Sequence, residues 1–194
     1  MSTAKRGKVR VENGRYRLDG QFHFPYPNDP IRNEHGELMG VTNPRDLTHV
    51  HMYGGEAPFF EALSQGKLLG TRCDNSDCGA NGSIFIPFRI HCPVKNNIVD
   101  MTDTARKGAT VHTFMITERT GAFNTLPKPI RFVNVEFEGV PTILMGYLSV
   151  GEPEIGMKVV PIFNTSKPSY TILDLSWVPE GTDESDIPKG FTFQ

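Results

Sequence analysis

Cysteine is scarce in this 194-residue chain, which has only three, at positions 73, 78 and 92. An odd number of cysteines without an export signal argues against a disulfide framework and predicts reduced, cytoplasmic thiols. The basic start, MSTAKRGKVRVENGRYR, has no apolar segment behind it and is therefore not expected to be a secretory signal.

Long apolar runs and an excess of one charge are also missing. No stretch approaches the roughly 18 apolar residues that a membrane-spanning helix needs. The formal net charge is −2, so the chain lacks the basic excess of a general nucleic-acid binder. These absences predict a soluble, intracellular protein.

Proline and glycine, by contrast, are plentiful, with 15 and 19 residues among many β-branched and aromatic ones. This composition is typical of a chain rich in strands and turns, and its length suits one domain or two small modules. We therefore expect a mainly β fold.

The first 55 residues contain little that could build a core. Asn13-Gly14 lies between alternating residues and predicts a small hairpin in VRVENGRYRL. The stretch that follows mixes Pro, Asn, Asp and Gly with aromatic residues, which excludes a long helix or a central strand. It is either a disordered tail or an extended arm, and its aromatic content favours an arm that packs on a partner or on the rest of the chain. The packing residues would be Phe22, Phe24, Tyr26 and Met39.

One helix is predicted clearly, in APFFEALSQGKL. Pro58 lies near its start, and Gly66 occupies the place of a C-terminal cap. The segment LLGTRC then leads as a strand into the cysteines, and SIFIPFRI, with its core at residues 84–90, is expected to be the returning strand.

After Ile98 the apolar residues alternate with a period of two, which predicts five strands. They are ATVHTFMITER, IRFVNVEFEG, VPTILMGYLSV, MKVVPIFN and YTILDLSWV. Five short strands in about 80 residues indicate a small barrel of the OB type. The expected organisation is therefore an arm (1–55), a helix with a rubredoxin-like zinc ribbon (56–97), an OB-fold barrel (98–179) and an acidic tail (180–194).

The three cysteines have the order of a zinc ribbon, in which two tight turns each deliver thiolates to a structural zinc ion. Cys73 and Cys78 fit the first turn, and Gly79 is able to adopt a positive φ after the second ligand. Cys92 begins the second turn. The residue three positions later, where a fourth ligand is expected, is Lys95, and a protonated lysine does not bind zinc.

Several alternatives for the fourth ligand stay open. His91 is adjacent to Cys92, and His49 or His51 could fold onto the site from upstream. A water, a backbone group or another side chain could also complete the shell. Alternatively, no metal binds and the cysteines are small buried apolar residues. A catalytic zinc is disfavoured because no neighbouring His–Glu pair is available as a general base.

Several motifs in this order resemble the zinc-ribbon plus OB-fold proteins associated with acyl-CoA enzymes, domain-of-unknown-function family 35. PFFEALSQGKLLGTRC matches the helix that leads into the ribbon, and the returning strand matches at Phe85, Pro87, Arg89, Cys92 and Pro93. GATVHTFMITER resembles the first barrel strand and GEPEIGMKVVPIF a later signature. The resemblance covers about residues 56 to 179, and Lys95 and the long arm depart from it.

The resemblance implies a non-catalytic subunit that assembles with a thiolase-fold enzyme acting on acyl-CoA thioesters. Such a subunit stabilises the complex and helps to bind the CoA thioester, and its zinc is structural. Within the group, the small subunits of benzoylsuccinyl-CoA-type thiolases, which act in the degradation of aromatic compounds, are the nearest resemblance. The long arm suggests a specialised partner.

The residues themselves agree with a non-catalytic role. The second half has no evident nucleophile–base pair, and its one histidine, His112, is expected to serve packing or a surface hydrogen bond. The stretch RTGAFNTLPKPIR offers Arg119, Phe123, Lys128 and Arg131 as candidate contacts for CoA phosphates and its apolar parts. The alternative for this stretch is an ordinary solvated loop.

Nucleic-acid binding and electron transfer are two alternative functions for such a chain. An OB fold can bind single-stranded nucleic acid through aromatic residues in a basic groove. Here Glu118, Glu136 and Glu138 lie among the aromatic residues of the predicted barrel, which disfavours that role. A rubredoxin-like electron carrier would need four thiolates around iron, and the chain has only three cysteines.

Overall fold

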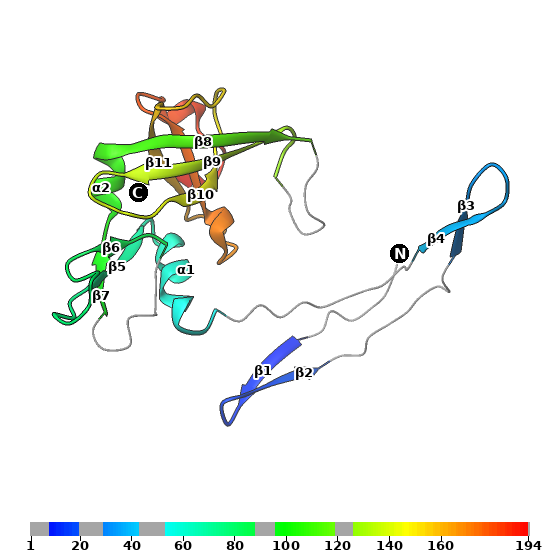
Figure 1. Ribbon diagram of the computed structural model, residues 1–194, viewed down its shortest axis with the longest axis horizontal. Coiled ribbons are helices and arrows are strands. Elements are labelled where there is room, and N and C mark those ends of the chain that lie inside the picture. Colours follow the sequence, from blue (N-terminus) through cyan, green and yellow to red (C-terminus); the bar gives the residue numbers. More distant parts are fainter. Residues whose placement is uncertain (1–7, 20–28, 43–52, 88–95, 119–125, 194) are drawn as a thin grey trace. The chain divides into compact units, whose positions relative to one another are not determined.

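The computed structural model describes residues 8–19, 29–42, 53–87, 96–118 and 126–193 (Figure 1). The chain divides into two compact units, Met1–Met52 and Tyr53–Gln194, and each is described by itself. Strands dominate both units, which confirms the predicted mainly β character. In the described part, no helix has the length and apolarity to cross a membrane.

The first unit contains the predicted hairpin. Strands β1 (Lys8–Glu12) and β2 (Arg15–Asp19) pair antiparallel, with Glu12 opposite Arg15. The turn between them is Asn13-Gly14, and both residues have positive φ angles, as a two-residue hairpin turn requires.

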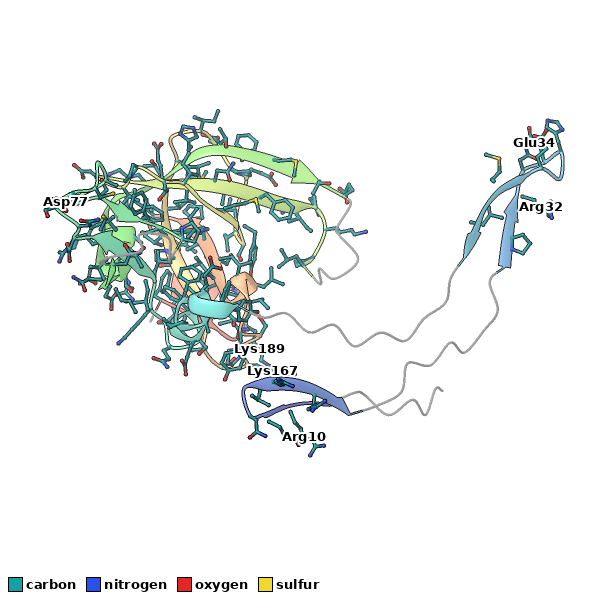
Figure 2. All side chains as sticks on the ribbon, turned by 60° about the horizontal axis from the view of Figure 1, so that its bottom comes forward. Arg10, Arg32, Glu34, Asp77, Lys167 and Lys189 are labelled. Carbon is teal, nitrogen blue, oxygen red and sulfur yellow. The ribbon has the colours of Figure 1, made fainter. Side chains whose placement is uncertain are left out.

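A second hairpin in this unit was not predicted. Strands β3 (Asp29–Arg32) and β4 (Leu38–Thr42) pair antiparallel around a loop organised by Asn33. The Asn33 side chain accepts hydrogen bonds from the backbone N–H groups of His35 and Glu37, both at 2.9 Å. Figure 2 shows Arg32 and Glu34 at this loop end of the hairpin. The predicted packing residues Phe22, Phe24 and Tyr26 lie outside the described residues, and the Met39 side chain is exposed.

The second unit begins with a short 3-10 helix, η1 (Gly54–Glu56), and the predicted helix, α1 (Ala57–Leu63). The helix ends earlier than the apolar pattern suggested, because Gly66 takes a positive φ of 74° and the backbone turns away. The N–H of Lys67 donates to the carbonyl of Ala62 at 3.0 Å, which caps the helix.

A three-stranded sheet follows, in the order β6-β5-β7. Its strands are β5 (Leu69–Cys73), β6 (Ile84–Phe85) and β7 (Asn96–Asp100). The first strand was predicted. Of the expected returning strand, residues 84–90, only Ile84–Phe85 pairs as a strand within the described part, and residues 88–90 lie outside it.

Helix α2 (Thr102–Gly108) connects this sheet to the next and was missed by the sequence analysis. Its buried residues are Thr102 and Ala105, and Asp103 lies in its first turn with Arg106 and Lys107 in its last. This charge distribution complements the helix dipole.

A six-stranded sheet forms the rest of the unit, in the order β10-β9-β8-β11-β12, with β13 also paired to β11. Its strands are β8 (Ala109–Thr117), β9 (Ile130–Phe137), β10 (Leu144–Tyr147), β11 (Lys158–Asn164), β12 (Leu175–Pro179) and β13 (Phe191–Thr192). All five predicted strands are therefore confirmed, although the last begins with a 3-10 turn, η2 (Ile172–Asp174). Another 3-10 turn, η3 (Glu184–Asp186), lies in the acidic tail, whose last strand joins the sheet.

Strands β10 and β12, at the two ends of this strand order, also contact each other. Leu148, directly after β10, forms a parallel bridge with Trp177 of β12, and the N–H of Ser149 donates to the Trp177 carbonyl at 2.9 Å. Gly146 allows this approach, because a Cβ there would lie 2.8 Å from the Trp177 indole nitrogen.

One hydrophobic core joins the elements of the second unit. It includes Phe59 and Leu63 of α1, Ala105 of α2, and Phe163 and Trp177 of the large sheet, all buried. Burial of this apolar surface fixes the cysteine-bearing sheet and both helices against the six-stranded sheet.

Candidate functional site: a cysteine turn and a polar pocket

The first predicted turn of the metal site lies at the end of β5. Cys73 is the last residue of that strand and is 1% exposed. Its N–H donates to the carbonyl of Ser83 at 3.0 Å, and its carbonyl accepts from the N–H of Gly82 at 2.7 Å. These two bonds close residues 74–82 into a tight loop.

Cys78 lies inside this loop and is partly buried. Its N–H donates to the carbonyl of Asn75 at 3.1 Å, and its own carbonyl accepts from Asn81 at 2.9 Å. Asp77, the neighbour of Cys78, lies at the outer tip of the unit (Figure 2). The loop therefore consists of two successive turns centred on the second cysteine.

Gly79, which can adopt a positive φ, does not do so in the structure. The left-handed residue of the loop is Gly82, with φ 81°, because the chain reverses where it rejoins Ser83 rather than directly after the second cysteine. A Cβ at Gly79 would meet nothing within 4 Å.

Charged and amide groups tie the base of this loop to β7. The carboxylate of Asp74 accepts from the Arg72 guanidinium at 2.8 Å and from the side-chain amide of Asn97 in β7. The hydrogen bond to Asp74 raises the pKa of Arg72. In the same region, Cys73 pairs with Asn96, the first residue of β7.

The described donor set is incomplete for a metal. In residues 8–19, 29–42, 53–87, 96–118 and 126–193, no three His, Cys, Asp or Glu side chains gather in a group that could hold an ion. The remaining candidate ligands lie outside these residues; they are Cys92, His91, His49 and His51, and so does Lys95, which stands where a fourth ligand was expected. Two thiols in one tight turn are half of the thiolate set that a structural zinc prefers.

The predicted CoA-contact residues are only partly described, since Arg119 and Phe123 lie outside the described residues. Lys128 is exposed. Arg131, in β9, forms a hydrogen-bonded ion pair with Glu152, with 3.0 Å between Nε and Oε1. The hydrogen bond from Arg131 lowers the pKa of Glu152, so the Arg131 guanidinium already has an anionic partner.

His112 makes the surface hydrogen bond that was one of its predicted roles. Its Nδ1 lies 2.8 Å from Oε2 of Glu136, and both side chains are 48% exposed. It occupies an irregularity in the pairing of β8 with β9, where Val111 pairs with Val135 and Thr113 with Asn134.

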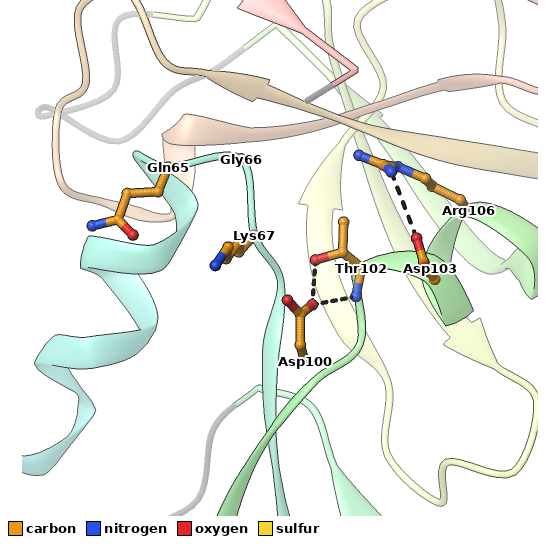
Figure 3. A pocket seen from close by; sticks show the side chains of 7 residues that line it. All are labelled: Gln65, Gly66, Lys67, Asp100, Thr102, Asp103 and Arg106. Carbon is orange, nitrogen blue, oxygen red and sulfur yellow. Dashed lines mark hydrogen bonds and ion pairs between the residues drawn. The ribbon is translucent and has the colours of Figure 1, made fainter.

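A polar pocket lies between the end of α1, the end of β7 and the start of α2 (Figure 3). It has a volume of about 450 Å³. Its lining residues are Gln65, Gly66, Lys67, Asp100, Thr102, Asp103 and Arg106. This pocket could not be predicted from the sequence, because its lining residues come from stretches with no shared motif.

The charged groups of this pocket have partners within it or close to it. Burial disfavours the ionised form of Asp100, but the Thr102 hydroxyl and N–H, with Lys67 and Arg106, outweigh it and lower the pKa of Asp100. Arg106 forms an ion pair with Asp103 at 3.6 Å and donates to the carbonyl of Phe193. Figure 3 shows Lys67 between Gln65 and Asp100 at the pocket, and its charge acts on the Asp100 carboxylate.

Comparison with known proteins gives no family model and no curated protein that matches the chain. The chain is similar to two solved DUF35 structures. One is a protein of unknown function from the DUF35 family of Sulfolobus solfataricus, 27% identical over 63% of this chain and 83% of that chain, with a TM-score of 0.43. The other is the Ltp2–ChsH2(DUF35) aldolase, 22% identical over 64% of this chain and 93% of that chain, with a TM-score of 0.47.

DUF35 is the family that the helix, cysteine and strand motifs resemble. The described elements follow the order expected from those motifs: helix α1, the cysteine turn, and then the strands of the large sheet.

Proposed function

We propose that this chain is a non-catalytic partner subunit of a thiolase-fold enzyme complex that acts on acyl-CoA thioesters, by C–C bond cleavage or acyl transfer. It holds the complex together and helps to bind the CoA thioester. The observation that carries the proposal is the order of elements in one core: α1, the cysteine turn at Cys73 and Cys78, and then the strands of the six-stranded sheet.

The six-stranded sheet is proposed to contain a five-stranded barrel of the OB type. Its connectivity supports this: β8, β9 and β10 form a meander, β11 pairs with β8, and β12 lies beyond β11. The parallel bridge between Leu148 and Trp177 brings the last strand against the third, so hydrogen bonding returns to its starting point.

The cysteine turn is proposed to hold a structural zinc ion through Cys73, Cys78 and Cys92. The first two lie in one tight loop, and the sequence places Cys92 four positions before Asn96, which pairs with Cys73. Bound zinc would link the loop after β5 to the segment before β7. Its bonds to the thiolates would contribute directly to the folding free energy.

The CoA thioester is proposed to contact the stretch that contains Arg119, Phe123, Lys128 and Arg131. Lys128 is exposed, and Arg131, with a side chain 27% exposed, forms an ion pair with Glu152, which is 65% exposed and which a phosphate would have to displace. The N-terminal unit is proposed as a further contact for the enzyme subunit, since Ile31 and Met39 leave apolar side chains 48% and 67% exposed.

Co-purification tests the proposal. The full chain, carrying a tag, is produced together with each thiolase-fold enzyme of its own source organism in turn and, separately, with a thiolase-fold enzyme from an unrelated organism as control. The proposal expects one enzyme of the source organism to co-purify in a fixed ratio and the control enzyme to wash away. Recovery of the tagged chain without any of these enzymes would contradict it.

A further inference from the structure

The β1–β2 hairpin of the first unit carries three arginines on one face. In the register of the two strands, Arg10 lies opposite Arg17 and Glu12 lies opposite Arg15. Because successive side chains of a strand point to opposite faces, these four side chains share one face and Val11 lies on the other. All four are exposed, and Figure 2 shows Arg10 projecting from the hairpin.

Two of these three arginines have no ion pair among the described residues. Arg10 forms an ion pair with Glu12 at 3.2 Å, and the two side chains are 58% and 51% exposed. Arg15 and Arg17 form none with the side chains that the structure describes. Three guanidinium groups therefore share the face with one carboxylate, and two of them lie directly opposite each other. Like charges in that position destabilise a strand pair.

The excess of guanidinium groups favours an anionic partner. A guanidinium group binds carboxylates and phosphates through paired N–H donors. Glu12 disfavours phosphates, because it lies on the same face, beside Arg10 and opposite Arg15, and would repel a phosphate backbone. Val11, on the other face, is 64% exposed. It gains by burial against apolar side chains, which a protein offers and a nucleic acid or a free phosphate does not.

The size of the hairpin points the same way. In the described part of the chain, β1 and β2 pair only with each other. Two strands alone are marginally stable in water. A partner that contacts the arginines and covers Val11 would therefore also stabilise the hairpin.

We propose that this hairpin docks on an acidic surface of the thiolase-fold enzyme subunit, an inference that rests on the function proposed above. Carboxylates of the enzyme bind Arg15 and Arg17 and offset the repulsion between Arg17 and Arg10. Apolar side chains of the enzyme cover Val11. The contact is expected to weaken with salt, since exposed charges are screened.

Arg17→Glu tests this assignment. The affinity of the full chain for the thiolase-fold enzyme that co-purifies with it is measured by biolayer interferometry. The substitution is expected to weaken binding at least about tenfold, because a carboxylate then faces the acidic surface. The same carboxylate lies opposite Arg10 and favours the pairing of the two strands. A less stable hairpin therefore does not explain the loss of affinity.

Lys167→Glu is the matched control, since it changes the net charge by the same amount at an exposed residue of the second unit. Its affinity should equal that of the unsubstituted chain. Arg17→Lys keeps the positive charge and should bind within about threefold of the unsubstituted chain. Raising the salt concentration from about 0.05 to 0.5 M should weaken the unsubstituted chain more than the Arg17→Glu variant.

Equal affinities of the unsubstituted chain and the Arg17→Glu variant would overturn this inference and leave the enzyme complex standing. The absence of any complex would instead overturn the proposed function, and this inference with it. Equal losses in Arg17→Glu and Lys167→Glu would show that net charge acts without the hairpin face. Binding of a short DNA duplex that Arg17→Glu abolishes would assign the face to phosphates and overturn its assignment to a protein.

Discussion

At the scale of single residues, the hydroxyl of Thr102 connects the cysteine sheet to the helices on either side of it. It accepts a hydrogen bond from the N–H of Leu68 at 2.9 Å and donates to Oδ1 of Asp100 at 2.6 Å. Leu68 and Thr102 are both buried. A buried backbone N–H therefore depends on one side chain for its partner.

Thr102→Val keeps the size of this side chain and removes the hydroxyl. We expect the free energy of unfolding to fall by about 2 kcal/mol, because the Leu68 N–H loses its buried acceptor. Thr102→Ser is the control, since it retains the hydroxyl, and it should cost less than half as much. Denaturant unfolding of the three proteins measures the difference, and equal losses in both variants would contradict this role.

The charge of Asp100 is expected to make stability depend on pH. Its pKa lies below the ordinary value of 3.8 in the folded chain, so the unfolded chain binds the proton more tightly. The carboxylate therefore stabilises the fold at neutral pH, and this contribution is lost as pH falls through the lowered pKa.

Asp100→Asn removes the charge and keeps the shape. At pH 7 the variant should be less stable by about 1 kcal/mol, a value reduced for the exposure of this carboxylate. The two proteins should converge as the pH falls through the lowered pKa of Asp100, because the carboxylate is then protonated. Urea unfolding at neutral and acidic pH checks this, and a difference that persists in acid would rule out the charge as its cause.

At the scale of elements, the contact between β10 and β12 decides whether the large sheet returns on itself. Gly146 faces the indole of Trp177, which is fully buried in the core. Since this glycine has no positive φ, its requirement is space rather than backbone conformation. The approach of the two strands therefore depends on the missing side chain.

Gly146→Ala is expected to destabilise the fold by about 2 kcal/mol or more, because the new methyl group would lie 2.8 Å from the indole nitrogen. Gly79→Ala, where a methyl group meets nothing within 4 Å, should change stability little. Thermal unfolding followed by the fluorescence of Trp177, the single tryptophan, measures both. Equal melting temperatures would show that β10 and β12 can separate freely.

The helices and strands that could be predicted from the sequence are those marked by nearby residues, such as capping residues or alternating apolar residues. Pro58 and Gly66 mark the ends of α1, and strict alternation marks the strands after residue 108. Helix α2 escaped because its seven residues, TDTARKG, lack a helical apolar period. Its start is fixed instead by the hydrogen bonds of Thr102 to Asp100 and Leu68.

The candidate site was predictable to a similar degree. The spacing of Cys73 and Cys78 indicated one tight turn, and the structure places them in it. The place of the left-handed residue could not be read from the sequence: Gly82 rather than Gly79 completes the loop, because β6 rejoins β5 there. The polar pocket could not be predicted, because tertiary packing alone brings Lys67 to Arg106.

At the scale of the whole molecule, a zinc ion would stabilise the three-stranded sheet, which the common core packs against the six-stranded sheet. Cys73→Ser is expected to release zinc and lower the melting temperature by at least about 5 °C, since metal binding adds to folding free energy. Asp77→Asn, in the same loop, is the control and should retain both. Elemental analysis and melting curves check this, and unchanged zinc and melting in the serine variant would exclude Cys73 as a ligand.

The central claim is that this chain serves the chemistry of another subunit. The most direct measurement is acyl-CoA turnover by the thiolase-fold enzyme that co-purifies with the chain, as the purified full chain is added stepwise. We expect no turnover by the chain alone, low turnover by the enzyme alone, and a rise that stops at a fixed ratio of the two. Turnover by the chain alone, or full activity of the enzyme without it, would show that the chain does not serve the chemistry of another subunit.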